Sequence, residues 1–228
     1  MCPYEMQAYC INLERNPERH ATAQAEFERE GLDVEFFRGT DGKAEAPDGL
    51  FIAKSEWGCA DSHIRVWRDV VEKGHEMALV FEDDISLVPN FTSKLQDIMA
   101  ELPDDWDFVN LGTTPGLHND YHRYSEHLVV GQSLMAHAYL ISHKCAKKWA
   151  LWESKYLHSP IDVFFMYYPS NNFHVHVDKS LAVQNGDVST IGGVFNRTFD
   201  WTFLMNRWGL IIAFLIIFAI LYTISKPK

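Results

Sequence analysis

Three consecutive acidic residues follow directly after a short apolar run, in the stretch ALVFEDD at positions 78–84. A continuous apolar run of this length predicts a strand that is buried on both faces. In α/β sheets, ligands bind at the carboxyl ends of strands, which is where Glu82, Asp83 and Asp84 would lie. Magnesium and manganese take oxygen ligands and commonly bridge to phosphates. The acids alone therefore suggest a metal–diphosphate site, and the alternative is a solvated acidic loop.

The elements that must position these acids follow from the rest of the pattern. Short apolar runs alternate with helical segments, which is typical of an α/β domain. Gly31 and Gly74 stand where two of the helices should end. Residues 42–53 are expected to form a loop, and 113–127 an irregular segment. Strands are predicted at residues 8–13, 34–37, 77–81, 108–111, 132–141, 173–177 and 181–183, and helices at 17–30, 55–73, 91–102, 143–155 and 161–168.

Composition limits the classes of function. The 228 residues are 47% apolar and 22% charged, which suits one compact domain with a packed core. A net charge of −11 disfavours nucleic acid as a partner, because such a surface repels phosphates. The four cysteines lack zinc-type spacing, and we expect reduced thiols rather than a disulfide framework.

An uncharged apolar segment covers residues 208–224. At about 1.5 Å rise per residue, a helix there would span about 25 Å, the short end of the range for a membrane crossing. Trp208 and Tyr222 lie where interface aromatics occur, and basic residues flank the segment. The alternative is a buried core helix. The predicted organisation is a catalytic domain at 1–200, a juxtamembrane linker at 201–207 and a transmembrane helix at 208–224.

The expected location is a membrane, with a single-pass C-terminal tail anchor. Basic residues on both sides of the apolar segment do not decide its orientation. The first ten residues lack the pattern of a signal peptide, which favours a catalytic domain on the cytosolic side. The sequon at Asn90 lies close after the acids, where a glycan would be awkward, and this also favours the cytosolic side.

The residues around the acids make the signal more specific. The stretch 58–91 resembles glycosyltransferase family 25, whose pattern has a Ser-His-x-x-x-Trp helix, a glycine and an apolar strand ending in Glu-Asp-Asp. Here these are Ser62, His63, Trp67, Gly74 and Glu82–Asp84. Further similar segments follow in the family's order, at 11–42, 137–148 (HAYLISHKCAKK), 160–162 (PID) and 183–191 (VQNGDVSTI), so that the resemblance covers about residues 6–192.

The resemblance implies a GT-A-like (Rossmann-like) nucleotide-sugar transferase domain. It also implies a UDP-sugar donor, usually UDP-galactose, a manganese or magnesium ion, and inversion at the anomeric carbon. The family includes enzymes of lipopolysaccharide and procollagen glycosylation, so the expected acceptor is a hydroxyl of a glycan, a lipid-linked sugar or a protein. The chain is short, so a homodimer or another partner is expected to complete the acceptor platform.

The resemblance also assigns roles around the acids. We predict Asp84 as the direct metal ligand, with Glu82 acting through the ribose or a metal-bound water. Asp83 is assigned to the donor site, with capping of the following turn as the alternative. Asn12, Arg15 and Arg19 stand where the first strand turns into a helix, and arginine suits phosphate oxygens. For the two arginines the alternative is a solvated helix face.

The catalytic candidates are Asp162 and His63. Asp162 is the predicted base, although an acid after Pro160 also stabilises a helix N-terminus, and Glu56 is the less favoured base. His63 is expected to line the site; packing against Trp67, four residues later, is the alternative. A serine hydrolase built on Ser62 and His63 is set aside, because no Gly-x-Ser-x-Gly elbow is present.

A row of polar residues at His174, His176 and Asp178 alternates along one predicted strand. It suggests His176 as a third metal ligand. The alternative is the polar face of an edge strand.

Two rival functions remain open. A phosphoryl transferase would use acids at strand ends in a similar way, but the first strand ends in Asn12-Leu-Glu-Arg and no P-loop is present. A catalytically inactive glycan-binding or scaffold protein on the same fold is the second rival.

Overall fold

The computed structural model describes residues 6–112, 122–131, 134–167, 172–176 and 179–185. The predicted linker at 201–207 and the predicted membrane helix at 208–224 lie outside these ranges, as does Asp178. Among the described helices, none is long and apolar enough to cross a membrane.

One mixed sheet forms the centre of the domain. Within the described residues it has eight strands in the order β2-β1-β3-β8-β5-β9-β7-β6. A separate two-stranded sheet joins β4 and β10. The strands are β1 (Gln7–Asn12), β2 (Glu35–Arg38), β3 (Met77–Glu82), β4 (Ile85–Leu87), β5 (Phe108–Asn110), β6 (His122–Arg123), β7 (Leu128–Val130), β8 (Ala138–Ser142), β9 (Asn172–Val175) and β10 (Ala182–Gln184).

The direction of the strands determines which residues share an edge. Strand β1 pairs in parallel with both β2 and β3, and β5 pairs in parallel with β9. Strand β8 lies between β3 and β5 and is antiparallel to both. Strands β1, β3, β5 and β9 therefore point the same way, and their carboxyl ends meet at one edge of the sheet. Asn12 and Glu82 stand at that edge on neighbouring strands.

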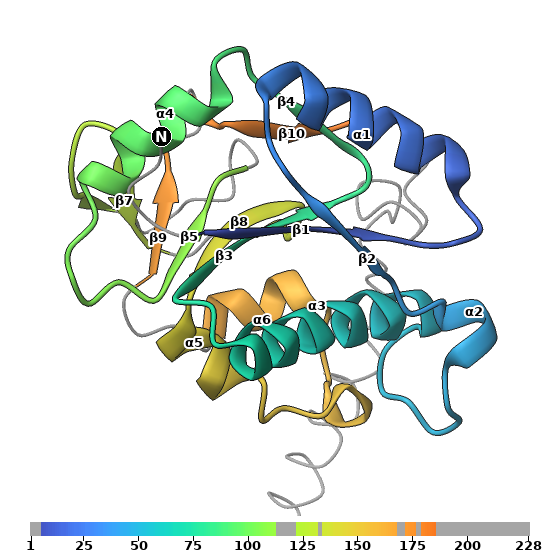
Figure 1. Ribbon diagram of the computed structural model, residues 1–228. Helices are drawn as coiled ribbons and strands as arrows, with labels where there is room; N and C mark the ends of the chain where they lie inside the picture. The colour runs from blue at the N-terminus through green and yellow to red at the C-terminus, as the bar shows by residue number, and fades with distance from the viewer. Residues whose placement is uncertain (1–5, 113–121, 132–133, 168–171, 177–178, 186–228) are drawn as a thin grey trace, which may run out of the picture. The chain divides into compact units, whose positions relative to one another are not determined.

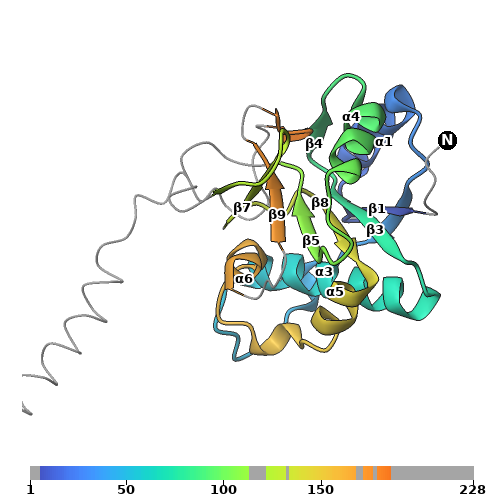
Figure 2. The same cartoon turned by 90° about the vertical axis from the view of Figure 1, so that its left-hand side faces the viewer.

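Helices cover both faces of the sheet (Figures 1 and 2). Helices α3, α5 and α6 pack on one face, with Trp67 of α3 fully buried among Trp149, Phe164 and Phe165. Helices α1 and α4 pack on the other face, together with β4 and β10. The helices are α1 (Pro17–Glu30), α2 (Gly42–Glu45), α3 (Lys54–Lys73), α4 (Phe91–Ala100), α5 (His143–Trp149) and α6 (Ile161–Tyr167), with a 3-10 turn at Ser154–Tyr156.

Most predicted elements are found within a few residues of their expected ends. Gly31 and Gly74 end α1 and α3 with φ of 66° and 72°, the left-handed conformation that glycine adopts without strain. Strand β3 is buried on both faces, as its apolar run predicts.

Several expectations were wrong in detail. The expected loop at 42–53 contains the short helix α2, whose first turn is capped by the Asp41 carboxylate accepting from the Lys43 N–H. The helix expected at 143–155 ends at Trp149. Strands β4, β6 and β7 were missed, because two or three residues are too few to show a period.

A close backbone approach at Gly58 gives a test of the packing. A Cβ on Gly58 would lie 2.6 Å from the Gly42 nitrogen and 2.7 Å from the Thr40 oxygen. Helix propensity alone predicts that Gly58→Ala stabilises by about 1 kcal/mol. We expect instead a loss of about 1–3 kcal/mol, because backbone atoms must move apart. Chemical denaturation measures the difference, with Glu72→Ala, at an exposed position of the same helix, as the control. A more stable Gly58→Ala variant would contradict the close approach.

Candidate donor and metal site

The three acids lie at the carboxyl end of β3, as predicted. Glu82 is the last residue of the strand and Asp83 and Asp84 follow in the turn that leads to β4. Asp83 and Asp84 are buried, with 6% and 7% of their surface exposed. These acids are therefore part of a structured site and not a solvated loop.

Arg19 of α1 joins the two aspartates. Its Nη1 donates to Asp83 Oδ1 and its Nη2 to Asp84 Oδ2, both at 2.8 Å. Asn12, at the end of β1, donates from Nδ2 to Asp83 Oδ2 at 2.7 Å. Burial raises the pKa of Asp83 even though the Arg19 charge opposes this. Asn12 and Arg19, both predicted for the donor site, therefore contact Asp83.

One carboxylate oxygen of Asp84 accepts hydrogen bonds, whereas the other has no partner among the described residues. Its Oδ2 accepts from Arg19 and, at 2.9 Å, from Gln184 Nε2. Its Oδ1 is buried and has no hydrogen-bond partner among the described residues. Burial and the charge of Glu82 raise the pKa of Asp84 to about 6. A buried carboxylate oxygen without a donor fits a cation ligand, since such an atom is costly to leave unpaired.

Glu82 points toward the helix α3 side of the strand end. Its Oε1 lies 3.3 Å from Cys59 Sγ and 3.3 Å from His63 Nε2. The other His63 nitrogen, Nδ1, lies 2.9 Å from the Tyr139 hydroxyl, which also accepts from Trp67 Nε1. Burial acts to raise the pKa of Glu82, but the hydrogen bond and charge of His63 lower it below its usual value.

His63 is fully buried, with no exposed surface. The His63 ring packs in the core, which was the alternative to a site-lining role. It also lies 3.3 Å from the Glu82 carboxylate, so both interpretations apply in part. We describe His63 as a positioning residue.

Asp162 lies in the first turn of α6 and is half-buried. Its Oδ1 accepts from the Val163 N–H at 2.8 Å, so it does cap its own helix. Burial, and the nearby charge of Glu82, raise its pKa. Glu56, the less favoured base, accepts from the Ala53 N–H at the start of α3 and is explained by that capping bond.

Arg15 and His176 lie away from the three acids in the structure. Arg15, in the turn between β1 and α1, pairs with Asp41 at 2.6 Å. His176 follows β9, which stands three strands from β3, or about 14 Å at about 4.8 Å per strand. Its role as a metal ligand stays a prediction. The edge-strand alternative was wrong, because β9 lies between β5 and β7 and His174 is buried there.

Four residues near the acids were not predicted as site residues. Gln184 contacts Asp84 directly, and Asn185 donates its backbone N–H to the Asp84 carbonyl at 2.6 Å. Cys59 contacts Glu82, and the backbone N–H of Glu82 donates to His137. A signal was present for all four, since each lies in one of the segments 58–91, 137–148 and 183–191 that carry the family resemblance.

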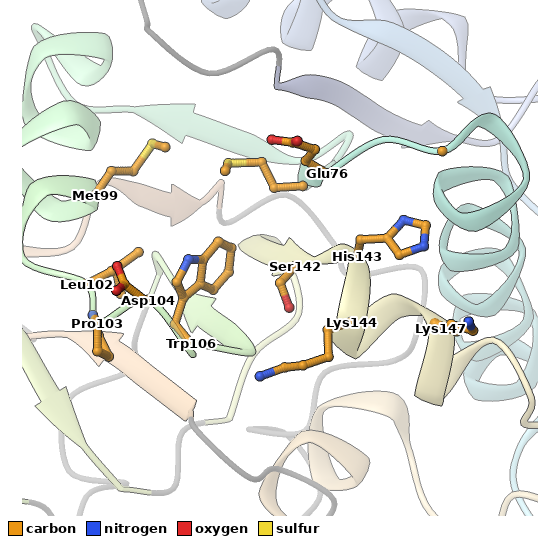
Figure 3. Close-up of a pocket in the computed structure, with 12 residues that line it drawn as sticks. Glu76, Met99, Leu102, Pro103, Asp104, Trp106, Ser142, His143, Lys144 and Lys147 are labelled. Carbon is orange, nitrogen blue, oxygen red and sulfur yellow. The ribbon is translucent and has the colours of Figure 1, made fainter.

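A hollow of about 790 Å³ lies elsewhere, beside the start of β3 and the end of β8. Met77, Trp106, Ser142 and His143 are among its lining residues (Figure 3). It contains none of the predicted site residues and lies toward the opposite edge of the sheet. This hollow therefore lies apart from the candidate site at the acids.

The fold matches a known glycosyltransferase structure. The crystal structure of a glycosyltransferase involved in the glycosylation of the major capsid of PBCV-1 is similar, with a TM-score of 0.53 and 10% identity, over 81% of this chain and 94% of that one. The domain thus has the α/β GT-A-like fold with a mixed central sheet. Residues 6–165 match the model of glycosyltransferase family 25 (LPS biosynthesis protein). The chain belongs to glycosyltransferase family 25.

The named relatives include one called a galactosyltransferase and one called inactive. A glycosyltransferase 25 family member of Aedes aegypti is 33% identical over 74% of this chain and 32% of its own length. Procollagen galactosyltransferase 1 of Danio rerio is 26% identical over 46% of this chain and 21% of its own. Inactive glycosyltransferase 25 family member 3 of Homo sapiens is 26% identical over 75% and 33%. The chain spans a third or less of the length of these relatives.

Proposed function

We propose that the protein is a metal-dependent inverting glycosyltransferase. It moves a hexose, by our proposal galactose, from a UDP-sugar to a hydroxyl of a glycan, a lipid-linked sugar or a protein. Family membership supports the reaction class, and the name of the Danio rerio relative supports galactose. The observation that carries the proposal is the Asp84 carboxylate, buried at a strand end with Oδ1 unpaired within the described residues.

The acids suit a divalent cation, manganese or magnesium. Asp84 would hold it directly and Glu82 would assist from the strand end, because both offer carboxylate oxygens. A cation bound there would neutralise charge on the diphosphate as the UDP leaves.

The other residues act on the substrates themselves. Arg19 sits against both aspartates and can turn its guanidinium toward phosphate oxygens when a donor enters. Asn12 keeps Asp83 in place through the 2.7 Å bond. Asp162 accepts the proton of the acceptor hydroxyl as that oxygen attacks the anomeric carbon; its raised pKa makes it a better base than an ordinary aspartate. The attack inverts the anomeric centre and UDP departs.

The wider organisation is proposed on sequence grounds. Residues 208–224 anchor the chain in a membrane as a single-pass C-terminal helix, with the catalytic domain (1–200) on the cytosolic side and 201–207 as the linker. A homodimer completes the acceptor platform.

The second candidate is a catalytically inactive protein of the same fold. The name of the Homo sapiens relative favours keeping it, since inactive members of the family exist. The intact Glu82, Asp83 and Asp84 favour activity here.

Donor binding separates the two candidates. Full-length protein in detergent is titrated with UDP-galactose, UDP-glucose and other nucleotide sugars by calorimetry, in manganese or in EDTA. We expect one donor to bind in manganese and to lose affinity in EDTA. Folded protein that binds no nucleotide sugar under any of these conditions would favour the inactive protein.

A further inference from the structure

Three potential metal ligands of different chemistry meet at the strand end, beside Asp84. They are the thiol of Cys59, the imidazole of His63 and the carboxylate of Glu82. Their donor atoms all lie within 4.8 Å of one another. Cys59 and His63 come from the same face of α3, four residues apart, and Glu82 comes from the adjacent end of β3.

Both separations that involve the Glu82 carboxylate are close to those between ligands of a tetrahedral zinc ion. Zinc takes nitrogen and oxygen at about 2.0–2.2 Å and sulfur at about 2.3 Å. At a tetrahedral angle this places a nitrogen and an oxygen about 3.3 Å apart, and a sulfur and an oxygen about 3.5 Å apart. The observed distances are 3.3 Å for His63 Nε2 to Glu82 Oε1 and 3.3 Å for Cys59 Sγ to the same oxygen.

We propose that Cys59, His63 and Glu82 form a zinc site with three protein ligands and one open position. Three protein ligands and an open fourth position are the pattern of zinc sites that exchange ligands, whereas structural sites are closed by a fourth side chain. Binding forms bonds from zinc to the sulfur, the nitrogen and the oxygen, and the thiol proton of Cys59 passes to solvent.

Tyr139, which contacts the second ring nitrogen of His63, can form a hydrogen bond to it in both the metal-free and the metal-bound state. Without metal, Nε2–H donates to Glu82 and the Tyr139 hydroxyl donates to Nδ1. With zinc on Nε2, the ring proton would lie on Nδ1, which is 2.9 Å from the Tyr139 oxygen in this structure, and the Tyr139 oxygen would accept it. A hydroxyl can serve as either partner, and a hydrogen bond to the second nitrogen is what orients a metal-bound histidine.

A second cluster in the described residues, Glu101, Glu126 and His127, is less suited. Glu101 already accepts from Ser125 and pairs with His127, and Glu126 pairs with Lys179. Glu126 is exposed, and the cluster offers no sulfur ligand. It serves as a comparison site in the test.

The site has a consequence for sugar transfer, although its existence does not depend on the proposed function. Glu82 is shared with the proposed manganese site. Zinc on Cys59 and His63 would hold Glu82 away from the donor, so zinc and manganese would compete for one carboxylate. Zinc binding is measured without any donor, so its failure and failure of the transferase proposal are separate results.

Cobalt reports the ligands directly, because tetrahedral cobalt bound to a thiolate has a sulfur-to-metal charge-transfer band in the near ultraviolet. Metal-stripped, reduced full-length protein is titrated with cobalt and then with zinc. We expect the band to appear and to be removed by one equivalent of zinc. Cys59→Ser should abolish the band and weaken zinc binding more than about 100-fold, whereas Tyr139→Phe should weaken it about 10–100-fold, as loss of an outer partner does.

Two variants serve as controls, Cys2→Ser for another thiol and Glu101→Gln for the second cluster. Both should keep the band and the zinc affinity. Circular dichroism shows that each variant is folded. The site does not exist if folded wild-type protein gives no thiolate band with cobalt, or if Cys59→Ser keeps both the band and the affinity.

Discussion

An Asp84→Asn variant should lose metal-dependent sugar transfer by about a thousandfold in kcat/KM. Asparagine keeps the shape of the side chain and one oxygen, but it removes the charge that a hard cation needs. The metal supplies several kcal/mol of charge stabilisation to the departing diphosphate, and about 4 kcal/mol corresponds to about a thousandfold. The fold should survive, because Asp84 is buried and its pKa is already raised to about 6, so the neutral form is easily accommodated.

The measurement is initial-rate transfer from the donor identified by calorimetry, in a manganese series, with thermal unfolding in EDTA alongside. Asp69→Asn is the matched control, since Asp69 is also an ion-paired aspartate but lies on α3 beside Tyr9 and Lys73. The control should keep its manganese-dependent rate. If Asp84→Asn were as active as wild type over the whole manganese series, Asp84 would not be a metal ligand.

Replacing Asp162 with asparagine should lower kcat by about 10²–10⁴-fold, with little change in donor affinity. This variant separates the two roles that Asp162 has in the structure. Asparagine can still accept from the Val163 N–H, so the cap on α6 is retained, but an amide cannot take a proton from the acceptor hydroxyl.

Single-turnover rates and donor calorimetry test the separation. Glu56→Gln is the control, because Glu56 is the other acid considered as base and its capping bond to Ala53 is also kept by an amide oxygen. Loss of rate in Glu56→Gln but not in Asp162→Asn would transfer the role of base to Glu56. Equal rates in wild type and Asp162→Asn would leave Asp162 with the helix cap alone.

The sequence predicted the elements that carry strong local signals. The buried run before Glu82 and the glycines that end two helices placed β3, α1 and α3 within one residue or exactly at their ends. Asn12 and Arg19 were predicted for the donor site because they stand where the first strand turns into a helix, and both contact Asp83 in the structure. These predictions rest on periods and stop signals that a few neighbouring residues contain.

The contacts and strands that the sequence did not predict depend on residues that are distant in the chain. Gln184 contacts Asp84 across 100 positions; the resemblance at 183–191 marks the segment, but no local pattern predicts the contact. Strand β4 has three residues and is a strand only because β10 pairs with it. The antiparallel insertion of β8 between β3 and β5 likewise comes from pairing. Arg15 was predicted for the donor site because it stands where the first strand turns into a helix, but its guanidinium pairs with Asp41.

The place of β8 also imposes an order of events on a chain made from its N-terminus. Strand β1 pairs with both β2 and β3, so three of the eight described strands can assemble once residue 82 has emerged. Strand β5 is the next strand of this sheet to be made, but it has no neighbour on the β3 side until residues 138–142 arrive. The strand β10 that supplies Gln184 is made later still. Contacts between distant positions form late because loop closure precedes them. During translation the strand end that carries the acids thus forms early, and Gln184 covers it last. Chaperones and proteases meet the acids while they are still uncovered.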